Sequence, residues 1–172
     1  LCGVVEPKHF NRLIEMLEKG QHLSIIQQAI KNALLPVSQK EQLKGINYWM
    51  IRSSNPSLYY PMLAQVCSAE AIAEIRKGYE GDYKQAAYEA LLTIDSPEMI
   101  DVLFEMAQAD KVNSQTILNR YTDLVSKSAQ KPIQQFQSYS QALALATDVK
   151  LQNRLIGLLG GTHAYQALLV VE

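Results

Sequence analysis

Three carboxylates and an amide recur at the spacing that brings helical side chains to one face. Glu98, Asp101, Glu105 and Gln108 follow one another at steps of three, four and three residues. The opposite face of the same predicted helix is apolar. Paired carboxylates perform acid–base or cation chemistry when one of them is desolvated in a cleft. Because these lie away from the apolar stripe, we interpret Glu98, Asp101 and Glu105 as an exposed surface that can contact a basic partner.

Aromatic residues are concentrated in one stretch of the chain, and tyrosine dominates it. The residues are Tyr48, Trp49, Tyr59, Tyr60, Tyr79, Tyr83 and Tyr88. Trp49 and Tyr83 fall on apolar stripes and are predicted to belong to the core. Tyr48, Tyr59 and Tyr60 have three possible roles: packing between helices, contact with a partner, or stacking against sugar rings. We carry these three tyrosines forward as candidate binding residues.

Motifs for catalysis and for metal binding are absent from the sequence. The histidines His9, His22 and His163 are far apart and form no pair at helical ligand spacing. There is no Gly-x-Ser-x-Gly elbow, no phosphate-binding loop, and no histidine close in sequence to Cys67. Cys2 and Cys67 match no metal motif, and their pairing is left open. We therefore predict a non-enzymatic protein with no catalytic residue, no metal site and no cofactor.

The elements that position these residues are predicted to be α-helices. Apolar residues recur with a period near 3.6 almost everywhere, as in Phe10, Leu13, Ile14 and Leu17, and no useful β alternation is found. Candidate helix starts are Ser38-x-x-Glu41, Asn55-Pro56, Asp82, Ser96-Pro97 and Asp148. About eleven helices of roughly 9–17 residues result, and their short linkers favour antiparallel neighbours.

A degenerate repeat follows from the spacing of these helices. Leu91, Leu124 and Leu158 lie 33 to 34 residues apart. The helix pairs we expect are Tyr83–Ala107, Ile117–Ala146 and Leu151–Val171. We therefore predict a single all-α domain over residues 1–172, built of stacked HEAT-like antiparallel helix pairs. The pairs are looser over residues 1–81 and clearer over residues 82–172.

Residues 116–172 resemble the HEAT-like repeat regions of large bacterial envelope or secreted proteins. The resemblance rests on Ala142–Ala146, on Asp148 and on Leu155–Gly160, whereas His163–Leu168 departs from the usual Pro-Glu-Ala-Leu pattern. It implies an armadillo-type, right-handed α-α superhelix. In that family the repeats accompany a concanavalin-like 3-keto-disaccharide hydrolase domain or another catalytic module, so no catalytic residue carries over. It slightly favours a periplasmic or secreted location, and otherwise the location stays open.

Charge and hydropathy narrow the classes of partner. The net charge is −1, and residues 66–110 hold ten acidic and three basic side chains. The basic residues are spaced singly, so we expect no nucleic-acid partner, and no apolar run is long enough to span a membrane. The apolar Leu168–Val171 does not resemble a solenoid cap, which predicts that the chain is part of a longer protein. We predict a scaffold that binds a protein, a peptide or another domain of the same chain; the alternative is an accessory module of a bacterial carbohydrate-active envelope protein.

Overall fold

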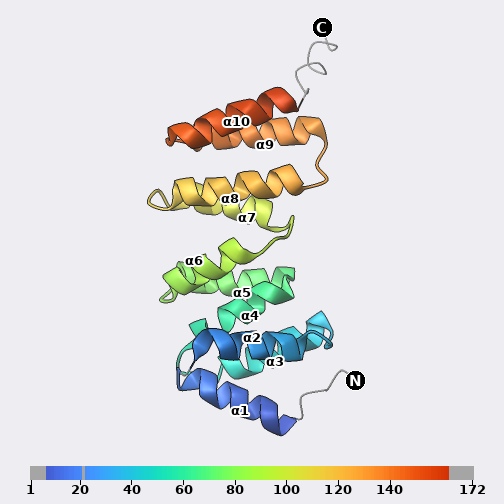
Figure 1. The fold of residues 1–172 in the computed structure, drawn as a ribbon. Helices are drawn as coiled ribbons and strands as arrows, with labels where there is room; N and C mark the ends of the chain where they lie inside the picture. The colour runs from blue at the N-terminus through green and yellow to red at the C-terminus, as the bar shows by residue number, and fades with distance from the viewer. Residues whose placement is uncertain (1–6, 21, 163–172) are drawn as a thin grey trace. The chain divides into compact units, whose positions relative to one another are not determined.

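The protein is all-helical over the part of the chain that its computed structural model describes, residues 7–20 and 22–162. These ranges contain ten α-helices, one 3₁₀ helix and no β-strand (Figure 1). The elements are α1 Pro7–Glu18, α2 Leu23–Leu34, α3 Gln39–Met50, η1 Pro56–Tyr59, α4 Tyr60–Val66, α5 Ala69–Glu80, α6 Lys84–Thr93, α7 Met99–Ala109, α8 Ser114–Lys127, α9 Pro132–Leu145 and α10 Val149–Gly161. The all-α prediction is confirmed, and the chain divides into two compact units, Leu1–Ile94 and Asp95–Glu172.

Two predicted helix starts are confirmed by hydrogen bonds. The Ser38 hydroxyl accepts from the Glu41 backbone N–H at 3.4 Å, and it donates to the Glu41 carboxylate at 2.9 Å. Asp148 accepts from the Leu151 N–H at 2.8 Å. The bonds from the Glu41 and Leu151 N–H groups each satisfy a donor that the first helical turn leaves free.

Two other predicted starts are displaced along the chain. Helix α7 begins at Met99 rather than at Pro97, because the backbone N–H groups of Met99 and Ile100 bond to Ser96 and Pro97 in a tighter turn. Helix α6 begins at Lys84, and its cap position is Tyr83 rather than Asp82. Both displacements are small, and helix ends are where local sequence signals are weakest.

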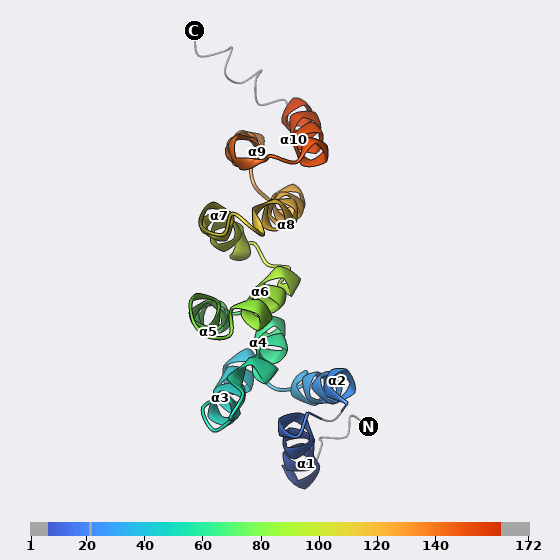
Figure 2. The ribbon, with the colours of Figure 1, turned by 90° about the vertical axis from the view of Figure 1, so that its left-hand side faces the viewer.

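The first unit is built from α1 to α6. Helix α1 packs on α2, α5 packs on α6, and the short α4 contacts α2, α3, α5 and α6 (Figure 2). The apolar period predicts the buried side well, because Leu17, Ile26, Ile30 and Ile46 are all buried. Trp49 is only half-buried, and its ring packs against Phe10 at a centroid distance of 4.7 Å.

The second unit consists of two stacked helix hairpins. Helix α7 pairs with α8 and α9 pairs with α10, while α7 also contacts α9 and α8 also contacts α10 (Figure 2). The expected pair Ile117–Ala146 combines α8 with α9. The pairing predicted from the sequence is therefore shifted by one helix from the pairing in the structure. The linkers around α8 and α9 have similar lengths, and spacing alone therefore does not distinguish the two pairings.

The leucine spacing nevertheless marks equivalent helices. Leu91 lies on α6, Leu124 on α8 and Leu158 on α10, which are the second helices of three successive hairpins. Leu91 and Leu124 are buried, and Leu158 is half-buried. The third expected pair, Leu151–Val171, is described only as far as Thr162. His163, Cys2 and Leu168–Val171 lie outside the described residues.

Candidate functional site

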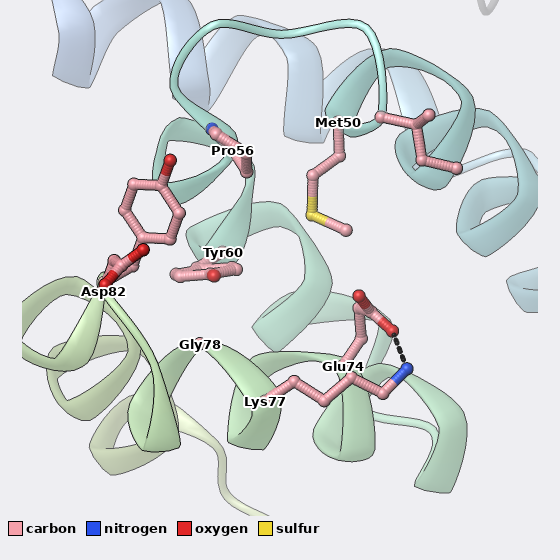
Figure 3. A pocket seen from close by; sticks show the side chains of 9 residues that line it. Met50, Pro56, Tyr60, Glu74, Lys77, Gly78 and Asp82 are labelled. Atoms are coloured by element: carbon pink, nitrogen blue, oxygen red, sulfur yellow. Dashed lines mark hydrogen bonds and ion pairs between the residues drawn. The ribbon is translucent and has the colours of Figure 1, made fainter.

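A pocket of about 350 Å³ opens on the first unit, between the end of α3 and the hairpin of α5 and α6 (Figure 3). Three segments meet there: the C-terminal end of α3, the start of η1 with the first residue of α4, and α5 with the turn that follows it. The lining residues are Met50, Ile51, Pro56, Tyr60, Glu74, Lys77, Gly78, Asp82 and Tyr83. All of them belong to the first unit, so this compact unit alone defines the site.

Tyr60 forms the floor of the pocket, and it depends on a glycine. A Cβ atom placed on Gly78 would come within 2.1 Å of the Tyr60 hydroxyl, so only glycine allows this approach of α4 to α5. Figure 3 shows the Tyr60 ring edge-on, with one face above Gly78 and the other toward Met50. The Tyr83 ring meets Tyr60 in an edge-to-face arrangement, with centroids 6.4 Å apart and planes at 78°.

Charged side chains surround this aromatic floor. On α5, the Lys77 ammonium lies 2.8 Å from the Glu74 carboxylate; the Glu74 side chain is 30% exposed and that of Lys77 73%. Asp82 lines the pocket on the other side of Tyr60 in Figure 3. Burial raises the pKa of the Tyr60 phenol, and the nearby negative charge of Glu74 raises that pKa further.

Apolar side chains, one buried and one exposed, also line the pocket. The Met50 thioether extends toward Tyr60 in Figure 3, and Ile51, the residue after it, is 78% exposed. Tyr48 is one helical turn before Ile51 and Arg52. The Arg52 guanidinium lies 3.7 Å from the centroid of the Tyr48 ring. Ile51 therefore extends the apolar lining of the pocket onto the exposed surface.

The three candidate tyrosines occupy different environments. Tyr48 is 54% exposed. Tyr60 is buried to 4% exposure, and it takes part in the site by lining the pocket. Tyr59 is fully buried, and its hydroxyl donates to Glu18 at 2.5 Å. A side chain with no accessible surface cannot contact a partner, so Tyr59 is a core residue and not a candidate binding residue.

The predicted acidic residues belong to the second unit and are exposed as expected. Asp101 and Glu105 are exposed on α7, and Glu98 is exposed just before its first residue. The Glu98 carboxylate accepts a hydrogen bond from the Ser96 hydroxyl. None of these residues lines the pocket at Tyr60.

The sequence alone does not predict most of the residues that line this pocket. Met50, Ile51, Glu74 and Gly78 come from segments that are far apart in the sequence. Two signals were present: an apolar Ile51 immediately beyond a helix end, and a glycine inside the helical pattern of α5, where glycine is unfavourable without a packing reason.

The lining residues of the pocket at Tyr60 contain two carboxylates, one amine and two phenols as ionisable groups. They include no serine, cysteine or histidine, which are the usual nucleophiles and bases. Across the described residues, no three histidine, cysteine, aspartate or glutamate side chains gather as a metal ion requires. The helices within residues 7–20 and 22–162 are all too short or too polar to cross a membrane.

A second hollow of about 450 Å³ lies in the same unit, between α2, α4 and α6. It has a more polar lining, and the Gln27 amide there donates to the Leu58 carbonyl at 3.1 Å. Exposed apolar residues are not associated with it, unlike the pocket at Tyr60. Comparisons of the chain with protein-family models, with curated proteins and with solved structures found no match in any of the three.

Proposed function

We propose that this chain is a non-catalytic interaction domain, and that the pocket over Tyr60 binds one side chain of a peptide segment. The segment belongs to a partner protein or to another domain of the same polypeptide. The observation that carries the proposal is the exposed Ile51 at the rim of a pocket lined by Met50, Tyr60 and Tyr83. Apolar and aromatic groups in a small pocket are the usual anchors of protein interfaces.

Size and rigidity support a side-chain ligand. A volume of about 350 Å³ is at the lower end of the range for small-molecule sites. The floor is held by helix packing, since Tyr60 is wedged between Gly78 and Tyr83. A pocket held by packing loses little conformational entropy when its ligand binds.

Selection from a phage-displayed random peptide library tests the proposal directly. The full chain is the bait, and selected peptides are resynthesised for measurement of Kd. Ile51→Ser should weaken their binding about tenfold, because it removes the exposed apolar side chain beside the pocket without adding a charge. Val149→Ser is the matched control, since Val149 is also an exposed aliphatic residue but belongs to the second unit.

One outcome of the peptide selection overturns the proposal. If selected peptides bind Ile51→Ser and the wild-type chain equally well, the pocket is not the interaction site. The triple variant Glu98→Gln, Asp101→Asn, Glu105→Gln then decides whether these three acidic residues are the contact instead.

The HEAT-like character of the helix pairs is a further part of this proposal. It is supported by the two stacked hairpins of the second unit, α7–α8 and α9–α10. It is also supported by Arg120 and Arg154, which lie 34 residues apart on the equivalent helices α8 and α10 and each pair with an aspartate. Small-angle X-ray scattering on the full chain tests the superhelix: a scattering curve of a compact sphere contradicts it.

A further inference from the structure

We infer that the side chain which enters this pocket is basic, that is, a lysine or arginine side chain of the peptide. This inference rests on the proposed function and adds the chemistry of the ligand. It follows from the combination of two aromatic rings, two carboxylates and an apolar wall in one small site, and each of these matches one part of a long basic side chain.

The apolar lining of the pocket is suited to the aliphatic part of a lysine or arginine side chain. Met50, Ile51 and Pro56 line the pocket together with Tyr60. Lysine and arginine bury their methylene groups along such surfaces and keep the charged end in a polar environment. A short acidic side chain would instead place its charge against Met50 and the tyrosine rings.

The aromatic rings of the pocket are suited to the charged end of a lysine or arginine side chain. One face of the Tyr60 ring, which is 4% exposed, is turned toward Met50 (Figure 3), and the half-buried Tyr83 ring lies nearly perpendicular to it. The face of an aromatic ring carries partial negative charge and attracts a cation within about 6 Å. The edge of a ring carries partial positive charge, so a cation must approach a ring face rather than an edge.

The carboxylates of the pocket favour a positively charged ligand. Glu74 and Asp82 both line the pocket, and Lys77 is its single basic residue. Lys77 binds Glu74 at 2.8 Å, so the structure already holds an alkylammonium group on this carboxylate. The Lys77 side chain is mostly exposed and is three residues from its partner, and such an exposed pair contributes little to stability. An incoming basic side chain can therefore replace Lys77 at Glu74.

This competition predicts two opposite effects within one helix. Removing the carboxylate in Glu74→Gln weakens the binding of a basic ligand. Removing the competing ammonium in Lys77→Gln strengthens it, because Glu74 is then free. A pocket that merely accepts apolar groups gives neither effect.

The test uses the full chain and two pairs of defined probes. Nα-acetyl-arginine methylamide is compared with the citrulline analogue, which has nearly the same shape and no charge. Nα-acetyl-lysine methylamide is compared with the norleucine analogue. Binding is followed by ¹H–¹⁵N NMR titration, with the backbone amides of Glu74, Lys77, Gly78 and Asp82 as reporters.

We expect the charged member of at least one pair to bind about five-fold more tightly than its neutral partner, at low salt. Glu74→Gln with Asp82→Asn should abolish that preference, and Lys77→Gln should increase it. Glu70→Gln, an exposed carboxylate of the same helix that does not line the pocket, is the matched control and should leave it unchanged.

The inference is overturned if neither charged probe is preferred, or if the preference survives the double substitution. The peptide selection separates this failure from that of the proposed function. Selected peptides that need Ile51 but bind equally well when each basic residue is replaced by citrulline or norleucine support the interaction site and overturn the basic ligand. Peptides that ignore Ile51 overturn the proposed site itself.

Discussion

The hydroxyl of Tyr59 donates a hydrogen bond of 2.5 Å to the carboxylate of Glu18, across 41 residues of sequence. Ser53 donates to the other oxygen of the same carboxylate at 3.0 Å. Glu18 is the last residue of α1, and Tyr59 ends η1 immediately before α4. This contact therefore fixes the first helix to the segment that carries Tyr60 and the floor of the pocket.

Replacement of Tyr59 by phenylalanine should destabilise the first unit by about 1.5–3 kcal/mol, which is typical for the loss of a hydrogen bond to a charged group. Urea unfolding followed by fluorescence measures this change, because Trp49 is the single tryptophan and belongs to the first unit. Tyr48→Phe is the control: Tyr48 is exposed, and its substitution should change the free energy of unfolding by less than about 0.5 kcal/mol. Equal effects of the two substitutions would contradict this role of Tyr59.

Stability of the first unit should fall at alkaline pH. Burial, and then the hydrogen bond to Glu18 and its charge, raise the pKa of Tyr59 above its ordinary value of 10.0. Above pH 10 the unfolded chain releases this proton while the folded chain keeps it, so the stabilisation is complete below pH 10 and is lost as pH rises. The loss amounts to about 1.4 kcal/mol per pH unit for one retained proton.

The urea midpoint, measured at several pH values between 9 and 11, checks this expectation. Tyr59→Phe should show a shallower decline than the wild-type chain, although other tyrosines, among them Tyr60, contribute in both proteins. Parallel pH profiles for the two proteins would show that Tyr59 does not hold its proton in the way proposed.

Gly78→Ala should destabilise the first unit by about 1–3 kcal/mol, because its new Cβ overlaps the Tyr60 ring and forces α4 and α5 apart. Tyr60→Leu in the same chain should recover part of the loss, since the clashing ring is removed. Gly157→Ala is the contrasting control. Gly157 lies inside α10 with nothing within 4 Å of an added Cβ, so alanine there should stabilise by about 0.5–1 kcal/mol. A stabilising Gly78→Ala would show that the approach of the two helices is not tight.

Asp95→Asn should cost the second unit more than Asp123→Asn. Asp95 accepts from both Arg120 at 3.2 Å and Lys127 at 3.4 Å, whereas Asp123 pairs with Arg154. The side chain of Arg120 is also less exposed than that of Arg154, 20% against 41%. Each exposed pair contributes at most about 1 kcal/mol. Hydrogen exchange of α7 and α8 measures the difference, which should shrink in 1 M NaCl because salt screens exposed charges.

Local chemistry in the sequence determined the helices, and several of their ends, with little outside information. A period near 3.6 identified the buried residues Ile26, Ile30 and Ile46, since one stripe of a helix must leave water. Ser38 and Asp148 were recognised as caps because their side chains satisfy neighbouring N–H groups. These interactions span a few residues, so the sequence contains both partners side by side.

The tertiary structure alone decided which helices pair and which tyrosines are available. Helix α8 pairs with α7 rather than with α9, although both of its linkers are short. Tyr48, Tyr59 and Tyr60 look alike in sequence, yet the first is exposed, the second donates to Glu18 and the third lies against Gly78. Burial and pocket formation depend on contacts between segments far apart in the chain, and no local pattern of residues encodes such contacts.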